Sequence, residues 1–264
     1  MIELDRVTKR YDGIVAVDSV SLRVEPGELV VLLGGSGSGK TTTLKMTNRL
    51  IEPSSGRIRV EGEDVTTVPP HALRRRIGYV FQRLGLFPHL TVAENVGITP
   101  ALLGWDARRI RGRVDTLLEL VELDPAEVRD RRPDALSGGQ AQRVAVARAL
   151  AAEPGVLLLD EPFGALDPIT RGRLQRSFAR VRRSLGFSAI FVTHDVVEAL
   201  LLGDRVGVMR GGRLLQLAPG RELVRAPADD YVADLVRGPL DQARAVESLI
   251  AGAPARTIAG GDAS

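Results

Sequence analysis

The sequence predicts an α/β fold whose core is a parallel sheet with helices on both faces. Three short apolar runs, typical of strands buried on both faces, lie far apart in the chain at 29–33, 155–160 and 188–193. Helical patterns separate these runs, and this alternation is typical of a parallel sheet. The chain has 264 residues and is 44% hydrophobic, which is enough for a substantial core.

The first 65 residues predict a small antiparallel sheet beside that core. Apolar and polar residues alternate over 2–8 and again over 15–24, the pattern of strands with one buried face. Residues 57–65 indicate another strand followed by a turn. Tyr11 is expected in the loop between the first two strands, where an exposed ring could stack on a base.

A glycine-rich loop follows the run 29–33. It fits the pattern Gly, four residues, Gly-Lys-Ser/Thr, and a helical pattern starts directly after it. Inward-facing backbone N–H groups and a helix N-terminus attract anions, so this stretch predicts a polyphosphate site. Lys40 is expected to reach the β and γ phosphates and Thr41 to ligate Mg²⁺. The residues expected to hold the nucleotide phosphates are Gly34, Gly35, Ser36, Gly37, Ser38, Gly39, Lys40, Thr41 and Thr42.

The rest of the chain predicts a helical insertion and a mixed C-terminal part. A short buried strand over 77–81 ends at Gln82, and helical patterns fill 84–150, which we interpret as an inserted subdomain. A hairpin is expected over 206–217. Further helices are expected over 221–225, 229–237 and 240–250, and the last dozen residues predict a loose tail.

Four polar positions coincide with the ends of expected parallel strands, where open parallel sheets bind their ligands. They are Gly34, Gln82, Asp160 and His194. Asp160 is expected to hold the Mg²⁺ shell, and Glu161 beside it to polarise an attacking water. Gln82 is expected to orient that water or ligate the metal, and His194 to hydrogen-bond the γ-phosphate.

A second anion site is predicted at residues 136–140, Leu-Ser-Gly-Gly-Gln. Ser-Gly-Gly at the start of a helix exposes backbone N–H groups and a hydroxyl. The nucleotide contacts expected here are Ser137, Gly138, Gly139 and Gln140.

Composition narrows the class of protein. The chain has no Cys, which excludes a disulfide framework and thiol chemistry, and no apolar run approaches the roughly 20 residues that span a bilayer. The net charge is +3, and the one dense basic run is Arg74-Arg75-Arg76, so no nucleic-acid partner is expected. A soluble cytoplasmic protein is the simplest expectation.

Together these motifs resemble the nucleotide-binding subunit of an ATP-binding cassette (ABC) transporter. The resemblance covers residues 1 to about 235 and implies a P-loop NTPase (RecA-like) core. Its motifs are the phosphate loop, the Q-loop Gln82, the signature 136–140, the Walker B strand 156–161, the D-loop 165–167 and the switch His194.

The sequence is most similar to the importers of osmoprotectants and other quaternary amines, such as glycine betaine, choline and carnitine. The stretches that carry this resemblance are 41–53, 85–89 and 160–171. Thr47 stands where that subgroup usually has Ile, and Ala141 follows the signature where Gln is common.

The resemblance implies an ATP-hydrolysing subunit that pairs head to tail with a second copy. Tyr11 would stack on adenine, while Ser137 and the amides of Gly138 and Gly139 would bind the γ-phosphate across the interface. A membrane permease would dock near Gln82, at the cytoplasmic face of the membrane, and an external binding protein would deliver the solute. We expect an ABC nucleotide-binding domain over 1–238 and a short tail over 239–264 without the regulatory CBS domains of many similar proteins.

Other functions remain open at this point. An importer ATPase for another solute, such as an amino acid or a polyamine, would share most of these motifs. A non-transport ABC ATPase is a further alternative, although such proteins often carry two cassettes or a long coiled-coil insert. A P-loop GTPase or kinase is disfavoured by the signature and by the lack of an Asn-Lys-x-Asp motif.

Overall fold

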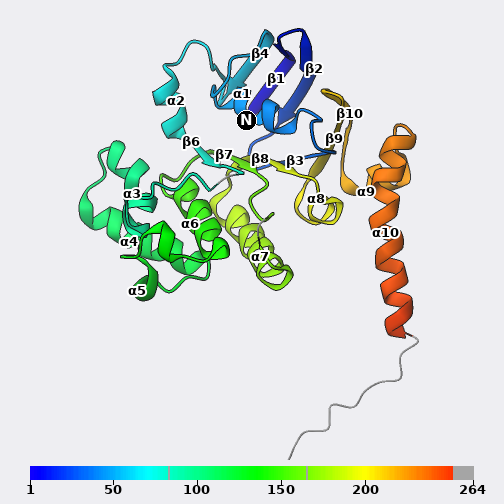
Figure 1. Cartoon of the computed structure of the whole chain (residues 1–264). Helices are drawn as coiled ribbons and strands as arrows, with labels where there is room; N and C mark the ends of the chain where they lie inside the picture. Colours follow the sequence, from blue (N-terminus) through cyan, green and yellow to red (C-terminus); the bar gives the residue numbers. More distant parts are fainter. Residues whose placement is uncertain (83, 165, 252–264) are drawn as a thin grey trace, which may run out of the picture.

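A six-stranded sheet forms the centre of the molecule in the computed structural model, which describes residues 1–82, 84–164 and 166–251 (Figure 1). The strand order is β10-β9-β3-β8-β7-β6, with β10 antiparallel to β9 and the other neighbours parallel. The strands are β3 (Leu29–Leu33), β6 (Ile77–Val80), β7 (Val156–Asp160), β8 (Ser188–Thr193), β9 (Arg205–Arg210) and β10 (Arg213–Ala218). The α/β class and the three apolar strands predicted from the sequence are confirmed.

A second sheet is antiparallel and has the order β2-β1-β4-β5, as predicted. Its strands are β1 (Ile2–Tyr11), β2 (Ile14–Val24), β4 (Ser55–Val60) and β5 (Glu63–Asp64). The placement of Tyr11 in a loop was wrong, because Tyr11 is the last residue of β1 and pairs with Ile14. Asp12 and Gly13, both with positive φ, suffice for the turn, so the strands continue up to it.

The helices lie on both faces of the six-stranded sheet (Figure 1). Four helices and a 3₁₀ turn, from α3 to α6, gather at one side of the molecule, as expected for an insertion. The helices are α1 (Lys40–Thr47), α2 (Pro70–Arg76), α3 (Val92–Leu102), α4 (Ala107–Leu120), α5 (Pro125–Val128), η1 (Pro133–Ala135), α6 (Gly138–Leu150), α7 (Pro168–Leu185), α8 (Val196–Leu202), α9 (Gly220–Arg225) and α10 (Asp230–Ala251).

Strand β3 separates two hydrophobic cores. Leu29, Val31 and Leu33 face the core shared with the helical side, whereas Val30 and Leu32 face the core beneath the antiparallel sheet. All five residues are buried, which explains why this strand reads as an unbroken apolar run. The loop that follows β3 is therefore fixed from both sides.

The C-terminal region differs from its prediction. The two helices expected over 229–237 and 240–250 are one helix, α10, which continues through Pro239. Val232 and Val236 anchor its first half in the core. The loose tail expected over the last dozen residues lies outside the described residues. Among the described helices, none is long and apolar enough to cross a membrane.

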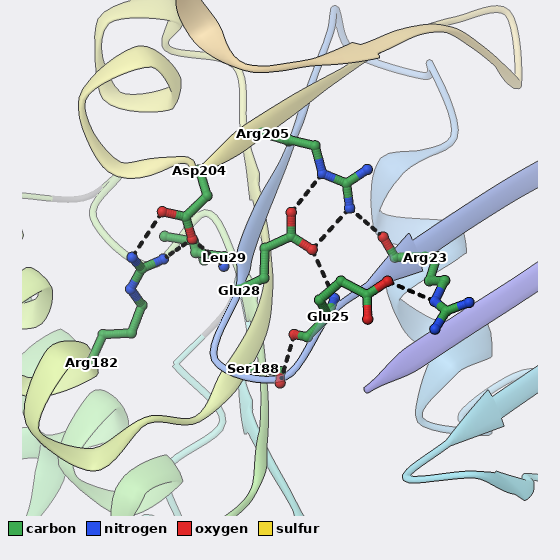
Figure 2. Close-up of polar contacts among 8 residues, drawn as sticks. All are labelled: Arg23, Glu25, Glu28, Leu29, Arg182, Ser188, Asp204 and Arg205. Carbon is green, nitrogen blue, oxygen red and sulfur yellow. Dashed lines mark hydrogen bonds and ion pairs between the residues drawn. The ribbon is translucent and has the colours of Figure 1, made fainter.

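A network of charged groups ties together the edge of the central sheet opposite the glycine-rich loop (Figure 2). Arg205 donates to both carboxylate oxygens of Glu28, at 2.5 and 2.8 Å, and also to the carbonyl of Arg23. Arg182 forms a similar two-bond pair with Asp204, which also accepts from the amide of Leu29. The network therefore joins the antiparallel sheet, β3, β9 and α7.

Hydrogen bonding keeps Glu28 in this network ionised. Burial alone would raise the pKa of Glu28, but hydrogen bonds from Arg205 and from the Glu25 amide outweigh it and hold the pKa below its usual range. Because the folded pKa is depressed, the ionised carboxylate stabilises the fold above the pKa of the unfolded chain, about 4.3. That stabilisation is lost as the pH falls through the folded pKa.

We predict that Glu28→Gln lowers the free energy of unfolding by about 1–2 kcal/mol at pH 7, because the charge-assisted bonds to Arg205 are weakened. Urea unfolding at pH 7 and near pH 3 checks this, and the difference from the unmodified protein should shrink at the lower pH. Asp5→Asn is the control, since the Asp5–Arg6 pair is largely exposed and should change stability by less than about 0.5 kcal/mol. An equal loss at both pH values would show that the charge of Glu28 is not what stabilises this edge.

Candidate functional site

The glycine-rich loop closes around the ammonium group of Lys40. Lys40 is the first residue of α1, and its Nζ donates to the carbonyls of Gly34 and Gly35, at 2.7 and 2.8 Å, and to Ser38 Oγ at 3.2 Å. Burial lowers the pKa of Lys40, and the nearby carboxylates of Glu161 and Asp160 oppose that shift. The ammonium group is therefore held at the centre of the loop.

Two glycines are required by the close packing of this loop. A side chain on Gly34 would collide with the carbonyl oxygen of Met209, and one on Gly39 would lie 2.6 Å from the carbonyl of Ala16. Gly39 also has φ of 101° and serves as the N-cap of α1 without any side-chain cap. The first turn of α1 thus offers backbone N–H groups to a bound anion, which fits a nucleotide phosphate.

Thr41 and Asp160 form a ready pair of oxygen ligands. Thr41 Oγ1 donates to Asp160 Oδ1 at 2.8 Å, which joins the start of α1 to the end of β7. Burial raises the pKa of Asp160, and the charge of Glu161 adds to this, while the hydrogen bond from Thr41 opposes it. A hydroxyl and a buried carboxylate beside a phosphate cradle are the donors that a Mg²⁺ ion prefers, so the site fits the predicted metal.

Glu161 and His194 meet at the same edge. His194 Nδ1 lies 3.2 Å from Glu161 Oε2, and the amide of Glu161 donates to the carbonyl of Val192 in β8. Glu161 has φ of 49°, which is uncommon for a residue with a side chain and turns its carboxylate out of the β7 strand. Glu161 is largely buried at 21% exposure and His194 is exposed at 64%, so the pair opens to solvent on the histidine side.

Gln82 and Tyr11 lie at the rim of this arrangement. Gln82 is exposed and follows β6, which pairs with β7 in the register Val80 to Leu159, so it leaves the sheet at the same edge as Asp160. Tyr11 is 44% exposed, and Lys9 Nζ lies 4.7 Å from the centre of its ring. Its hairpin contacts the loop through Ala16 of β2 beside Gly39.

The predicted second anion site lies at the start of α6, apart from the glycine-rich loop. Ser137 caps α6, where its Oγ accepts from the amide of Gln140 at 3.2 Å and its own amide donates to Gln140 Oε1. Ser137 and Gly138 are exposed, and the position of Gly139 is close to Leu166. Among the described residues, no hydrogen bond joins 137–140 to the loop 34–41. The D-loop residue Ala165 lies outside the described residues, and Leu166 and Asp167 are within them.

Comparison with known proteins identifies the family. A family profile described as ABC transporter matches residues 17–164, more than half of the chain. The chain belongs to the ABC transporter family.

Several curated ABC proteins are similar to this chain. The glycine betaine/carnitine/choline transport ATP-binding protein OpuCA of Bacillus subtilis is 48% identical over 237 residues, covering 89% of this chain and 62% of the relative. The osmoprotectant import ATP-binding protein OsmV of Salmonella typhimurium is 49% identical over 241 residues, covering 89% of this chain and 63% of the relative. The spermidine/putrescine import ATP-binding protein PotA of Acidothermus cellulolyticus is 49% identical over 229 residues, covering 87% of this chain and 59% of the relative. The chain thus spans about three fifths of the length of these relatives.

A solved ABC cassette shares the fold. The ATP-binding cassette MJ0796, determined as a dimer in a post-hydrolysis state bound to ADP and Pi, superposes with a TM-score of 0.78 at 33% identity. The match covers 84% of this chain and 99% of that cassette. It confirms the predicted P-loop NTPase fold.

Two contacts of this ABC cassette were not predicted from its sequence. The amide of Gly212, at the tip of the β9–β10 hairpin, donates to the carbonyl of Ser38, and Asp18 of β2 donates to the carbonyl of Gly212. The hairpin therefore braces the glycine-rich loop against the antiparallel sheet. The sequence predicted the hairpin over 206–217 but gave no sign of what its turn contacts.

Arg148, near the end of α6, was also missed. It is buried, its pKa is lowered by that burial, and it donates to the carbonyls of Leu84 and Gly85 at 3.2 and 2.6 Å. It thereby links the signature helix of the cassette to the segment after Gln82. The sequence contains many arginines, and no pattern around Arg148 indicates that this one is buried.

We predict that Gly34→Ala lowers the free energy of unfolding by about 1–3 kcal/mol and sharply weakens nucleotide binding, because the new methyl group would displace Met209 or the loop. Gly35→Ala is the matched control, since its nearest neighbour would be the Tyr231 hydroxyl at 3.9 Å, an ordinary contact. Urea unfolding and fluorescence titration with an ATP analogue check both variants. Equal behaviour of the two variants would contradict the claim that Gly34 is needed for close approach.

Proposed function

We propose that this chain is the ATP-hydrolysing, energy-coupling subunit of an ABC importer. The observation that carries the proposal is the convergence of Lys40, Thr41, Asp160, Glu161 and His194 at one edge of the parallel sheet. The family match and the ADP-bound and Pi-bound state of a similar cassette support the same conclusion.

The residues of the loop bind the nucleotide. The backbone of 34–39 and the side chains of Ser36, Ser38 and Thr42 hold the phosphates, with Lys40 at the β and γ positions. Thr41 and Asp160 would hold Mg²⁺, with Gln82 as a further ligand, and the ion when bound would neutralise charge on the phosphate oxygens. The exposed ring of Tyr11 stacks on the adenine.

The polar residues at the strand ends perform the hydrolysis. Glu161 accepts a proton from the attacking water, as its carboxylate is oriented by His194 at 3.2 Å. His194 hydrogen-bonds the γ-phosphate from its exposed side. Gln82, beside them on the rim, orients the water.

Two copies assemble head to tail. Ser137, Gly138, Gly139 and Gln140 bind the γ-phosphate held by the partner's loop. The proposal is supported by the exposure of Ser137 and Gly138 at the start of α6 and by the dimeric state of the similar cassette. A site on one chain that does not reach its own phosphate loop is explained if it serves a second copy.

A membrane permease docks in a groove between the central sheet and the helical insertion. The groove has a volume of about 260 Å³. Its lining combines exposed Phe87 and Leu102 with Arg74 and Arg75, which suits a short amphipathic helix with an acidic residue. Docking there places the chain at the cytoplasmic face of the membrane, and an extracytoplasmic binding protein delivers the solute to the permease.

The transported solutes are osmoprotectants or other quaternary amines, such as glycine betaine, choline or carnitine. This part of the proposal is supported by the printed functions of OpuCA and OsmV and by the stretches 41–53, 85–89 and 160–171. A polyamine importer is the second candidate, favoured by the similarity to PotA. No residue of this chain is proposed to contact the solute.

We predict that the complete transporter, with its permease and binding protein in vesicles, imports glycine betaine, choline or carnitine when ATP is supplied inside. Uptake is measured with a panel that also contains spermidine, amino acids and unrelated sugars. Lys40→Ala is the control and should abolish uptake, because the phosphates lose their cation. Uptake of spermidine without uptake of any quaternary amine would favour the second candidate.

Head-to-tail pairing predicts how two defective chains behave when mixed. A Lys40→Ala chain and a Ser137→Arg chain, each with a different affinity tag, are purified as heterodimers and assayed for ATP hydrolysis. Each ATP site of the pair is formed by the phosphate loop of one chain and the signature of the other. One of these composite sites then carries both defects and the other carries neither, so activity should recover to about half of the unmodified level, provided one site can turn over. Heterodimers without activity would contradict trans pairing or the competence of a single site.

A further inference from the structure

Arg171 binds the backbone of the D-loop residue Leu166 and of the two residues just before the D-loop, Phe163 and Gly164. It lies in the first turn of α7, and its guanidinium donates to three carbonyls of the preceding segment: Phe163 at 3.2 Å, Gly164 at 3.4 Å and Leu166 at 3.2 Å. These carbonyls lie between β7 and α7, so a side chain takes over part of the hydrogen bonding that a regular element would supply. The planar guanidinium, with five N–H donors, is suited to several acceptors at once.

The same guanidinium also contacts the switch segment. Arg171 Nη1 lies 3.7 Å from Asp195 Oδ2, and Asp195 follows the switch His194 and caps α8 by accepting from the amide of Glu198. A cavity of about 30 Å³ lies among Glu161, Arg171 and His194. Arg171 is thus anchored beside the hydrolytic residues of its own chain while it binds the D-loop.

The D-loop lies next to the signature of the same chain. A side chain at Gly139 would lie 3.3 Å from Leu166 Cδ2, so the start of α6 and the D-loop form one continuous surface. Leu166 is buried, whereas Ile169, one turn away on α7, is 71% exposed. A surface that presents the signature to a second copy therefore presents the D-loop to that copy as well.

We propose that Arg171 is a positioning residue that fixes the D-loop and the adjoining signature for the ATP site of the partner chain. The inference rests on the head-to-tail pairing of the proposed function. One hydrogen bond of the guanidinium reaches Leu166 of the D-loop, which adjoins the signature at Gly139, and two reach Phe163 and Gly164 just before it. The ion pair toward Asp195 is longer, so the main effect of Arg171 falls on the partner's site. Among the described residues, no hydrogen bond or ion pair joins Arg171 to the phosphate loop of its own chain.

Single-chain variants give the first test. Arg171→Met removes all donors at similar length, and Arg171→Lys keeps the charge with fewer directed bonds. We expect Arg171→Met to bind an ATP analogue within about twofold of the unmodified chain and to lose about 10- to 100-fold in ATP hydrolysis, with Arg171→Lys between the two. Arg173→Met, an exposed arginine of the same helix, should leave hydrolysis unchanged. Unchanged hydrolysis in Arg171→Met would overturn the proposal.

Mixed chains decide where Arg171 acts. A Lys40→Ala chain is paired with an Arg171→Met chain as a purified heterodimer, and the pairing with Ser137→Arg serves as the reference. Both defects fall on one composite site if Arg171 acts on the partner, so activity should recover as it does with Ser137→Arg. If Arg171→Met only disturbed the structure of its own chain, its defect would not fall on the site that Lys40→Ala already disables, and activity would not recover.

The outcomes separate this proposal from the proposed function. Recovery with Ser137→Arg but not with Arg171→Met would place Arg171 at its own chain's site and overturn the inference, while leaving head-to-tail pairing intact. Failure of both mixtures would overturn the pairing and this inference with it. If Arg171→Met does not fold, the Arg171→Lys chain is used in the same mixture with the same expected recovery.

Discussion

The register of the parallel strands is the constraint on which the rest of the site depends. Leu33 pairs with Thr193, Asp160 with Val192, and Val80 with Leu159, so all four strands end at the same edge of the sheet. The phosphate loop, Glu161, His194 and Gln82 follow directly from those ends. A slip of one residue in any strand would turn its side chains to the opposite face and separate these groups. The bond from Thr41 to Asp160 then ties helix α1 to the same edge.

Two loops of irregular backbone connect this edge to the surfaces that partners would use. The segment after Gln82 is held by Arg148 of α6, and the D-loop is held by Arg171 of α7. In each case a guanidinium satisfies backbone carbonyls, which fixes a segment whose own backbone forms no helix or strand. Helix α6 begins at the signature and carries Arg148 near its end, so one helix joins the signature to the groove proposed for a permease.

Much of this architecture could be predicted from the sequence. The apolar runs at 29–33, 155–160 and 188–193 predicted the buried strands, and the polar residues after them predicted the site, because strand ends converge in any parallel sheet. The features that the sequence did not predict were missed for physical reasons. A periodic pattern placed Tyr11 in a loop because it does not encode how far a hairpin extends. The helical patterns over 229–237 and 240–250 were kept separate, whereas α10 continues through Pro239. Arg148 and Arg171 could not be distinguished from solvent-exposed arginines, since every residue carries a backbone carbonyl and an acceptor of this kind leaves no pattern in the sequence.

The most direct test of the account is the rate of ATP hydrolysis by Glu161→Gln, measured with its affinity for ATP. We expect that binding is retained, that turnover falls by about 10²–10⁴-fold, the usual scale for a general base, and that an ATP-bound dimer accumulates. Glu153→Gln is the matched control, because Glu153 also has a positive φ and lies in an exposed surface pair with Arg109. Hydrolysis by Glu161→Gln at the rate of the unmodified chain would contradict the central role assigned to this carboxylate.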